Sequence, residues 1–267
     1  MTATRVFTRG DYRIGVATNF GPRVVSLSWR DGAELFAQLE PSVTVEHPDR
    51  PYVLHGGHRL WVAPEVPAVT YAPDDAPCEV REDGETILIE ANPDGAGIAK
   101  RIVIEHDEDR LRVEHRLTNA GETTVHAAPW AISQVPHGGE AILPLGQRSD
   151  PESFQADRRL ILWPYTDLSD SRIEFGPNSV RIAATAGPRL KLGSGPLIAR
   201  VDYVRGAQRL TKTFEVAAGE QTWADLGAVA QVFCGQDCAE LETLGPVVAL
   251  TPGESTTHVE YWTVQHV

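Results

Sequence analysis

The 267-residue sequence has few of the features that mark membrane or secreted proteins. No apolar run approaches the roughly 18 residues of a membrane span. The N-terminus, MTATRVFTRGDYRIG, lacks the apolar stretch of a signal peptide. Cysteine is scarce: Cys78, Cys234 and Cys238 are the only three, and a small, odd number indicates a reducing compartment. We therefore expect a cytoplasmic protein with no disulfide scaffold and no membrane partner.

Basic residues are also few compared with acidic ones. The chain has 24 Lys and Arg residues against 37 Asp and Glu, a formal charge of −13. A surface this negative repels nucleic acid and anionic lipid, and no basic run or phosphate-binding glycine loop compensates. A neutral small-molecule sugar remains a compatible partner. A sugar phosphate is less compatible, unless Lys191, Lys212 and Arg172 gather in three dimensions. The oligomeric state is left open.

No residue spacing calls for a cofactor or a metal; we expect no cofactor, name no metal ligands, and leave a bound metal open. Cys234 and Cys238 form a single C-x-x-x-C pair with no second pair nearby. A structural zinc site needs four ligands. Two small residues that flank a turn are therefore the better interpretation of this pair.

Long helical stripes are missing, and alternation of apolar and polar residues takes their place. The clearest example is Lys100–Asn119, which predicts an antiparallel hairpin with a turn at Asp107–Asp109. His115 lies on its apolar face, which predicts a hydrogen-bonded core residue. The remaining predicted strands are Tyr12–Thr18, Arg23–Trp29, Thr86–Glu90, Thr123–Ser133, Arg172–Phe175, Ser179–Thr185, Leu197–Val204, Thr211–Val216, Thr222–Leu226, Val229–Phe233 and His258–Val264.

This pattern predicts one all-β domain over residues 1–267, a sandwich of large antiparallel sheets. A short helix is expected near Asp237–Leu244. No composition break divides the chain.

One polar and aromatic segment runs from Leu54 to Glu65. Two glycines between His55 and His58 allow a tight turn and a close approach to a ligand. Arg59, Trp61 and Glu65 then supply a donor fork, a stacking face and an acceptor. A sugar needs this mixture, because it presents apolar C–H faces and fixed hydroxyls. Either histidine alone is better interpreted as a backbone cap, but the ensemble favours a site.

A second group of candidate binding residues follows two later strands. It comprises Trp130, Gln134, His137, Trp163, Asp170 and Lys191. A tryptophan in a β-sandwich is more often core than binding platform, and aspartates in such loops commonly cap turns. Only convergence of these loops at one end of the sandwich would form a cleft.

Glu242 is the candidate general base. Glu240 and Glu242 share one face if the chain is extended and diverge if it is helical. A partly buried carboxylate has a raised pKa and can act as a base near neutral pH. Solvent-facing glutamates are the alternative.

These segments resemble the aldose 1-epimerases of the galactose mutarotase-like superfamily. The resemblance rests on His55-Gly56-Gly57 with Trp61, on Leu241-Glu242-Thr243, and on Leu250-x-Pro-Gly-Glu254. The closer match is a DUF4380-type branch, in which Gly-Gly-His-Arg-Leu-Trp-x-Ala-Pro-Glu and Trp-Pro-Tyr-x-Asp recur. The resemblance implies a β-supersandwich with few short helices and a sugar cleft on its concave sheet.

The resemblance also implies anomer interconversion, with Glu242 as the base and His55 as the substrate-contacting histidine. The family's acid histidine lies in a His-x-Tyr-Phe-Asn segment, where this chain has Pro129-Trp130-Ala131-Ile132. The acid is therefore open among His55, His58 and His137. Two alternatives remain: a sugar-binding protein without catalysis, and a hydrolase or lyase that uses cleft carboxylates such as Glu65, Asp170 or Glu242.

Overall fold

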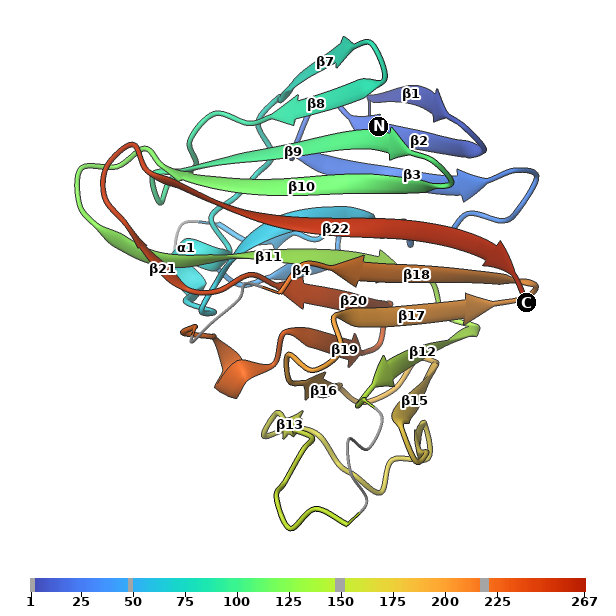
Figure 1. Cartoon of the computed structure of the whole chain (residues 1–267). Coiled ribbons are helices and arrows are strands. Elements are labelled where there is room, and N and C mark those ends of the chain that lie inside the picture. The colour runs from blue at the N-terminus through green and yellow to red at the C-terminus, as the bar shows by residue number, and fades with distance from the viewer. Residues whose placement is uncertain (1–2, 48–49, 147–151, 217–220) are drawn as a thin grey trace.

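Two ten-stranded antiparallel sheets face each other and make up most of the structure (Figure 1). It is a computed structural model that describes residues 3–47, 50–146, 152–216 and 221–267. The first sheet contains, in spatial order, β1 (Thr4–Arg9), β2 (Tyr12–Ala17), β3 (Arg23–Trp29), β6 (His58–Ala63), β11 (Val125–Val135), β20 (Ala239–Leu244), β19 (Ala230–Cys234), β16 (Leu190–Ser194) and β13 (Leu160–Leu162), with β21 (Val248–Leu250) paired to β11.

The second sheet carries the C-terminal strand near its middle. Its order is β14 (Ile173–Phe175), β15 (Ser179–Ala184), β12 (Gly139–Pro144), β17 (Arg200–Arg205), β18 (Gln208–Phe214), β22 (Ser255–His266), β10 (Arg110–Asn119), β9 (Ile98–Asp107), β8 (Thr86–Glu90) and β7 (Glu79–Asp83). A separate small ribbon pairs β4 (Thr44–Val45) with β5 (Tyr52–Val53). The helical segments within the described residues are α1 (Pro67–Thr70) and the 3-10 turn η1 (Asp225–Gly227). No helix in this part of the chain is long and apolar enough to cross a membrane.

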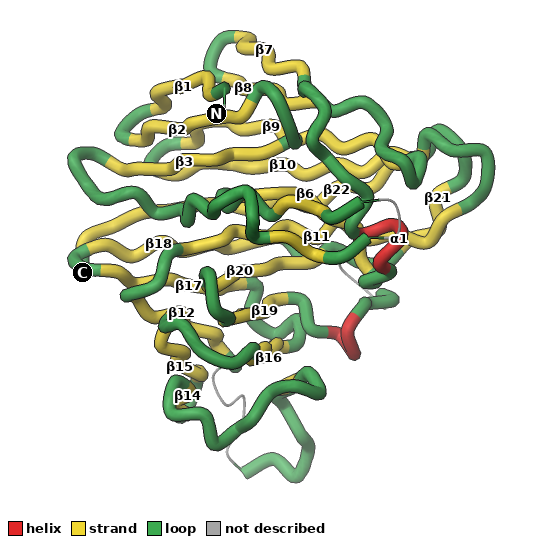
Figure 2. The backbone as a smooth tube through the Cα atoms, turned by 180° about the vertical axis from the view of Figure 1, so that it is seen from behind, coloured by secondary structure: helices red, strands yellow, loops and turns green. Residues whose placement is uncertain are grey.

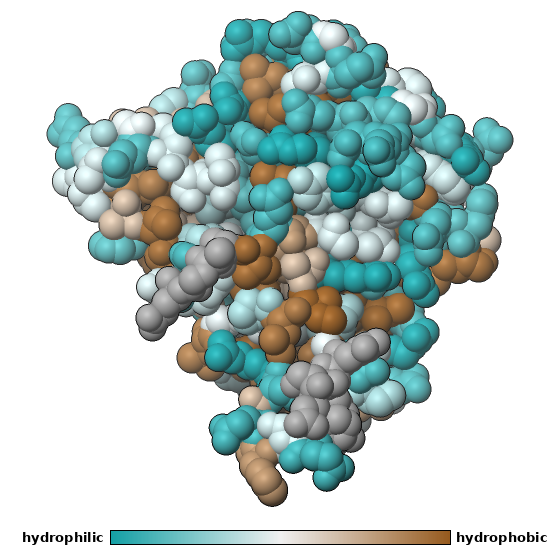
Figure 3. All heavy atoms as spheres, viewed as in Figure 1, coloured by the Kyte–Doolittle hydropathy of each residue, from teal (hydrophilic) through white to brown (hydrophobic). Residues whose placement is uncertain are grey.

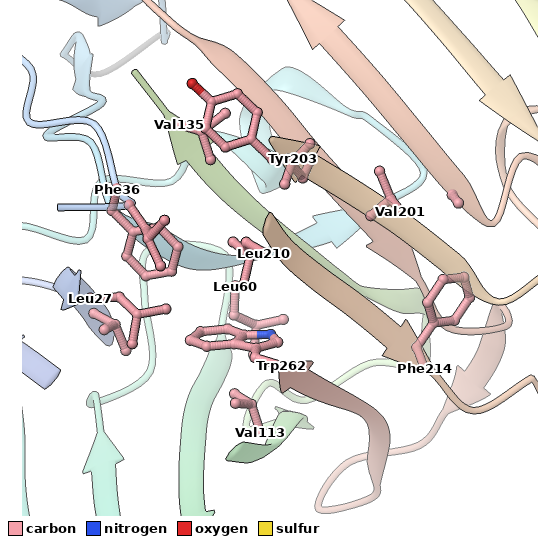
Figure 4. Packing of buried hydrophobic residues seen from close by; sticks show 14 of the residues in the cluster. Leu27, Phe36, Leu60, Val113, Val135, Val201, Tyr203, Leu210, Phe214 and Trp262 are labelled. Atoms are coloured by element: carbon pink, nitrogen blue, oxygen red, sulfur yellow. The ribbon is translucent and has the colours of Figure 1, made fainter. Parts of the chain in front are cut away.

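The main hydrophobic core fills the space between the sheets (Figure 4). Leu60 and Val135 come from the first sheet, and Val113, Leu210 and Trp262 come from the second. Inward-facing apolar residues alternate with polar ones along β9 and β10, so burial along β10 alternates residue by residue. The all-β prediction of two large antiparallel sheets is confirmed.

The predicted hairpin over Lys100–Asn119 is also confirmed, as β9 and β10 pair over their whole length. His115 is fully buried and hydrogen-bonded in the core, as its position predicts. Cys234 and Cys238 are free and buried at either end of a tight turn, closed by a bond from Gly235 N to Cys238 O.

Two predicted elements are wrong. The helix expected near Asp237–Leu244 is instead strand β20, because its backbone pairs with β11 on one side and β19 on the other. The strand expected at Thr222–Leu226 does not form, since Asp225 and Leu226 adopt φ of 49° and 56° within the turn η1. A residue with a side chain adopts this left-handed region only in turns, which ends any extended run.

The outer faces of the two sheets differ. In Figure 3 the upper part of the second sheet's face is mainly hydrophilic, and β9 and β10 lie there. By contrast β6 and β20 are buried at every residue, on both faces. Seen from behind, loops run across the strands of the first sheet (Figure 2). Over β6 and β20 the outer face of the first sheet is therefore covered, and the polar side chains there lie in a low-dielectric environment.

Candidate active site

Glu242 lies on the covered outer face of the first sheet, at the centre of the candidate site. Its strand β20 directs Leu241 into the main core, and alternation turns Glu242 to the opposite face. The side chain is fully buried. Oε2 accepts hydrogen bonds from Lys191 Nζ at 2.7 Å and from Trp130 Nε1 at 2.8 Å. Oε1 accepts none from the described residues.

This environment makes Glu242 an unusual carboxyl group. Its pKa is raised to about 7. Burial raises it most, the charge of Lys191 opposes this, and the neighbouring charge of Glu240 adds to the rise. A carboxyl group with a pKa near 7 exchanges protons efficiently at neutral pH. The interpretation of Glu242 as a solvent-facing glutamate is therefore wrong.

Lys191 is held in place by two tryptophans as well as by Glu242. Its ammonium lies 4.7 Å from the ring centroid of Trp130 and 4.6 Å from that of Trp163. These cation–π contacts hold the ammonium between the two rings. Its backbone N–H and C=O both bond to the hydroxyl of Thr166, which ties β16 to the loop that carries Trp163.

A second polar cluster lies on the same strands. Glu240 Oε1 accepts from Arg59 Nη2 at 3.0 Å and from Gln134 Nε2 at 2.9 Å. The Arg59 guanidinium stacks 3.9 Å from the ring of Trp61. Arg59 faces the covered side because β6, β11 and β20 are in register there: Arg59 pairs with Ile132, which pairs with Glu242. The two clusters are therefore neighbours on one face.

Aromatic rings surround these charges. Trp61 and Trp130 meet edge to face with centroids 5.6 Å apart, and Tyr71 packs 5.0 Å from Trp61. The Tyr71 hydroxyl donates to Glu65. Tyr165 is 39% exposed, and its pKa is raised by burial and by the charges of Glu242 and Glu65, which places its hydroxyl in their electrostatic range.

His58 lies on the opposite face of the sheet from Glu242, inside the main core. Its Nε2 lies 2.7 Å from Nε2 of His115, and its Nδ1 lies 2.8 Å from Ser133 Oγ. His115 Nδ1 donates to the carbonyl of His258, so the network is consistent with two neutral rings. Burial, with the charges of His115 and Lys212, lowers the pKa of His58 well below 6.5.

The same core network includes the one group of potential metal ligands that the described residues bring together. The ligand atoms of His58, His115 and Glu260 lie within 4.8 Å of one another. However, Glu260 already pairs with the Lys212 ammonium at 2.9 Å, and Trp262 donates to it. A bound cation would have to displace the lysine charge, so these residues fit a hydrogen-bonded core better than a metal centre.

His55 belongs neither to the clusters around Glu242 and Glu240 nor to the core network of His58. It adopts φ of 56° and stacks on Phe20 with ring centroids 3.9 Å apart. It lines a cavity of about 420 Å³ together with Gln38, Ser26 and Asn19. Burial and the charge of Arg23 lower its pKa. The next residues, Gly56 and Gly57, also have positive φ, and a Cβ at Gly57 would lie 2.3 Å from Val24 O. The two glycines therefore permit a tight turn and a close approach to neighbouring backbone, and the predicted approach to a ligand stays a prediction.

Two other predicted site residues lie apart from Glu242. His137 lies in the connection from β11 to β12, where the chain passes from one sheet to the other. Asp170 forms an ion pair with Arg172 at 2.6 Å, and this contact lowers its pKa. The basic residues Lys191, Lys212 and Arg172 do not gather, since each pairs with a different carboxylate.

The structure thus brings together Glu242, Lys191, Trp130 and Trp163, and beside them Arg59, Trp61 and Gln134. It adds three residues that were not among the candidate site residues: Glu240, Tyr71 and Tyr165. The sequence placed Glu240 on the face of Glu242 only if the segment is extended, and the structure shows that it is. Tyr165 belongs to the Trp-Pro-Tyr-x-Asp motif, whereas Tyr71 carried no signal in the sequence.

Comparisons with solved structures support the fold. The Slr1438 protein of Synechocystis sp. PCC 6803 has a TM-score of 0.61 and 12% identity over 100% of this chain and 97% of that one. A candidate aldose 1-epimerase of Escherichia coli K12 has a TM-score of 0.59 and 13% identity over the whole of both chains. A galactose mutarotase-like protein of Clostridium acetobutylicum has a TM-score of 0.57 and 10% identity over 98% and 95%.

Neither a family model nor a curated protein matches the chain. The chain has the galactose mutarotase-like fold, because the similarity to these structures spans nearly all of it. Identities this low carry the fold and not the activity. The DUF4380-type branch stays a prediction.

Proposed function

We propose that this protein acts on carbohydrates as an aldose 1-epimerase-like isomerase that interconverts the anomers of a neutral sugar. The observation that carries the proposal is Glu242: a fully buried carboxyl group with a pKa of about 7 and one oxygen without a partner among the described residues. It lies among tryptophan rings, which suit the apolar faces of a sugar.

In this proposal Glu242 Oε1 takes the proton from the C1 hydroxyl. The ring opens to the aldehyde, C1 rotates, and the ring closes on the other face. A base of this pKa matches the operating pH, so proton transfer is efficient in both directions. Arg59, Gln134 and Glu240 would position sugar hydroxyls from the neighbouring strands. His58 has no direct role here, because its ring lies in the core.

The main competing function is sugar binding without catalysis. The aromatic surroundings of Lys191 favour it, since stacking rings improve binding without moving a proton. A hydrolase is less well supported, because Asp170 is held by Arg172 and Glu240 by Arg59 and Gln134. We also propose a cytoplasmic location, in keeping with the sparse cysteines.

The test is NMR exchange between α and β anomers across a panel of aldoses. Wild type is expected to accelerate exchange of at least one sugar, and Glu242→Gln to lose about 10²- to 10⁴-fold of that acceleration. Glu174→Gln, which removes an exposed carboxylate on the edge strand β14, is the matched control and should retain it. Line broadening without acceleration would favour a binding protein. Equal rates in wild type and Glu242→Gln would remove Glu242 from the mechanism.

A further inference from the structure

Anomer interconversion requires an acid as well as a base, and the residues around Glu242 include no histidine that contacts it. His58 lies in the core with His115. His55 stacks on Phe20 beside a separate cavity. The one cation that forms an ion pair with Glu242 among the described residues is Lys191.

We infer that Lys191 is the general acid of this site and that Lys191 and Glu242 work as one acid–base pair. This inference rests on the proposed function, because it names the second catalytic group of the same reaction.

The geometry of the pair matches the two atoms that exchange protons. The C1 hydroxyl oxygen and the ring oxygen are bonded to the same carbon, so they lie close together, and a base and an acid that are neighbours can reach both. Lys191 Nζ and Glu242 Oε2 are 2.7 Å apart. A base and an acid this close together can serve both oxygens of one C1 carbon.

Both groups have unused hydrogen-bonding capacity. Glu242 Oε1 has no donor among the described residues. Among the described residues the Lys191 ammonium donates one hydrogen bond, to Glu242, and an ammonium has further N–H donors to offer. Its other contacts are with the faces of Trp130 and Trp163, which hold a cation without accepting its protons in conventional hydrogen bonds. The ammonium is therefore held in position with donors to spare.

The step balances without a further reactant. Glu242 takes the proton from the C1 hydroxyl, the oxygen lone pair forms the C1=O bond, and the bond from C1 to the ring oxygen breaks. The ring oxygen takes a proton from the Lys191 ammonium. The pair is then a neutral carboxylic acid beside a neutral amine. After rotation of C1 the ring oxygen attacks the other face of the carbonyl and returns its proton to Lys191, while Glu242 protonates the carbonyl oxygen, which becomes the new C1 hydroxyl.

The test compares Lys191→Ala with wild type in the same anomer-exchange measurement, with and without added methylammonium or ethylammonium. Lys191→Ala is expected to lose about 10²- to 10⁴-fold, and the small amine to restore part of the rate because it fits where the lysine head lay. Glu242→Gln is the control and should gain nothing from the amine. Lys191→Met, which keeps the length of the side chain, should be as slow as Lys191→Ala and should keep the same melting temperature as wild type.

The outcomes separate the two claims. A wild type that accelerates no sugar would overturn the proposed function, and the role of Lys191 with it. An active wild type with undiminished rates in Lys191→Ala and Lys191→Met would overturn Lys191 alone. Amine rescue that is equal in Glu242→Gln would also overturn it, since the amine would then be acting as a bulk catalyst.

Discussion

Glu242 and Glu260 are both fully buried, and each accepts hydrogen bonds from one lysine and one tryptophan. Glu242 has Lys191 at 2.7 Å and Trp130 at 2.8 Å. Glu260 has Lys212 at 2.9 Å and Trp262 at 2.7 Å. The two glutamates lie in different places: Glu242 on the covered outer face of the first sheet, Glu260 on β22 facing the core. Their pKa values nevertheless shift in opposite directions.

The difference lies in the remaining oxygen and in the nearby charges. Both oxygens of Glu260 have partners: Lys212 and Thr243 contact Oε1, and Trp262 donates to Oε2. Burial alone would raise its pKa, but the charge of Lys212 and the neighbouring histidines lower it. Glu242 leaves Oε1 without a donor and has Glu240 nearby. Burial therefore raises the pKa of both carboxyl groups, but the surrounding positive charges outweigh it at Glu260 and do not at Glu242.

The largest effect is expected when the core ion pair between Glu260 and Lys212 is broken. Glu260→Gln should lower the free energy of unfolding by about 3–5 kcal/mol, because Lys212 is then a buried charge without a counter-charge. Glu242→Gln should cost much less at pH 7, since a carboxyl group with a pKa near 7 is already neutral in half of the molecules. Urea unfolding of both variants measures this. Equal losses would mean that the two pairs are energetically alike.

The second prediction concerns pH. The pKa of Glu242 is raised in the folded state from 4.5 to about 7, so between these values the folded protein holds a proton that the unfolded chain has released. Glu242 therefore lowers stability as pH rises through this window. The free energy of unfolding of Glu242→Gln, measured relative to that of wild type, should therefore rise from pH 4.5 to 7.

Glu260 should behave in the opposite way. Its pKa is lowered below 4.5, so its contribution is complete above that pH and is lost as pH falls through its folded value. The free energy of unfolding relative to wild type, measured for Glu242→Gln between pH 4.5 and 7 and for Glu260→Gln below pH 4.5, gives both slopes. Slopes of the same sign for the two variants would contradict the comparison.

The smallest expected effect comes from the two tryptophans. Trp262→Phe removes a hydrogen bond to an ionised group and should cost about 1.5–3 kcal/mol. Trp130→Phe removes the corresponding bond to Glu242, which is only partly ionised at neutral pH, so it should cost less and should raise the pKa of Glu242 instead. Carbon-13 titration of the Glu242 carboxyl group would detect that rise. An unchanged titration would show that Trp130 does not stabilise the carboxylate.

Much of the fold could be predicted from alternation alone. The hairpin of β9 and β10 was readable because apolar residues recur at every second position over both strands and a charged turn joins them. β20 was not, since Ala239–Leu244 is short and its residues also suit a helix. Its extended form depends on pairing with β11 and β19, which are far away in sequence. The turn at Asp225 and Leu226 was missed for a related reason, because positive φ at residues other than glycine leaves little trace in a sequence.

The candidate site followed the same division. The importance of Glu242 and Trp61 could be inferred from a motif, and Arg59, Trp130 and Lys191 from local clusters of polar and aromatic residues. His58 belongs to the same sequence motif as Trp61 but lies in the core. It precedes Arg59 by one residue on a strand and therefore faces the opposite side of the sheet.

The sequence by itself therefore determined the all-β class, the acidic and cysteine-poor character, and the segments from which polar and aromatic side chains come. These are properties of composition and of period-2 alternation, which act along the chain. Only the tertiary structure decided which lysine meets which glutamate. Lys191 and Glu242 are 51 residues apart, and Lys212 and Glu260 are 48 apart, so strand pairing and sheet packing, not local sequence, bring each pair together and shift each pKa.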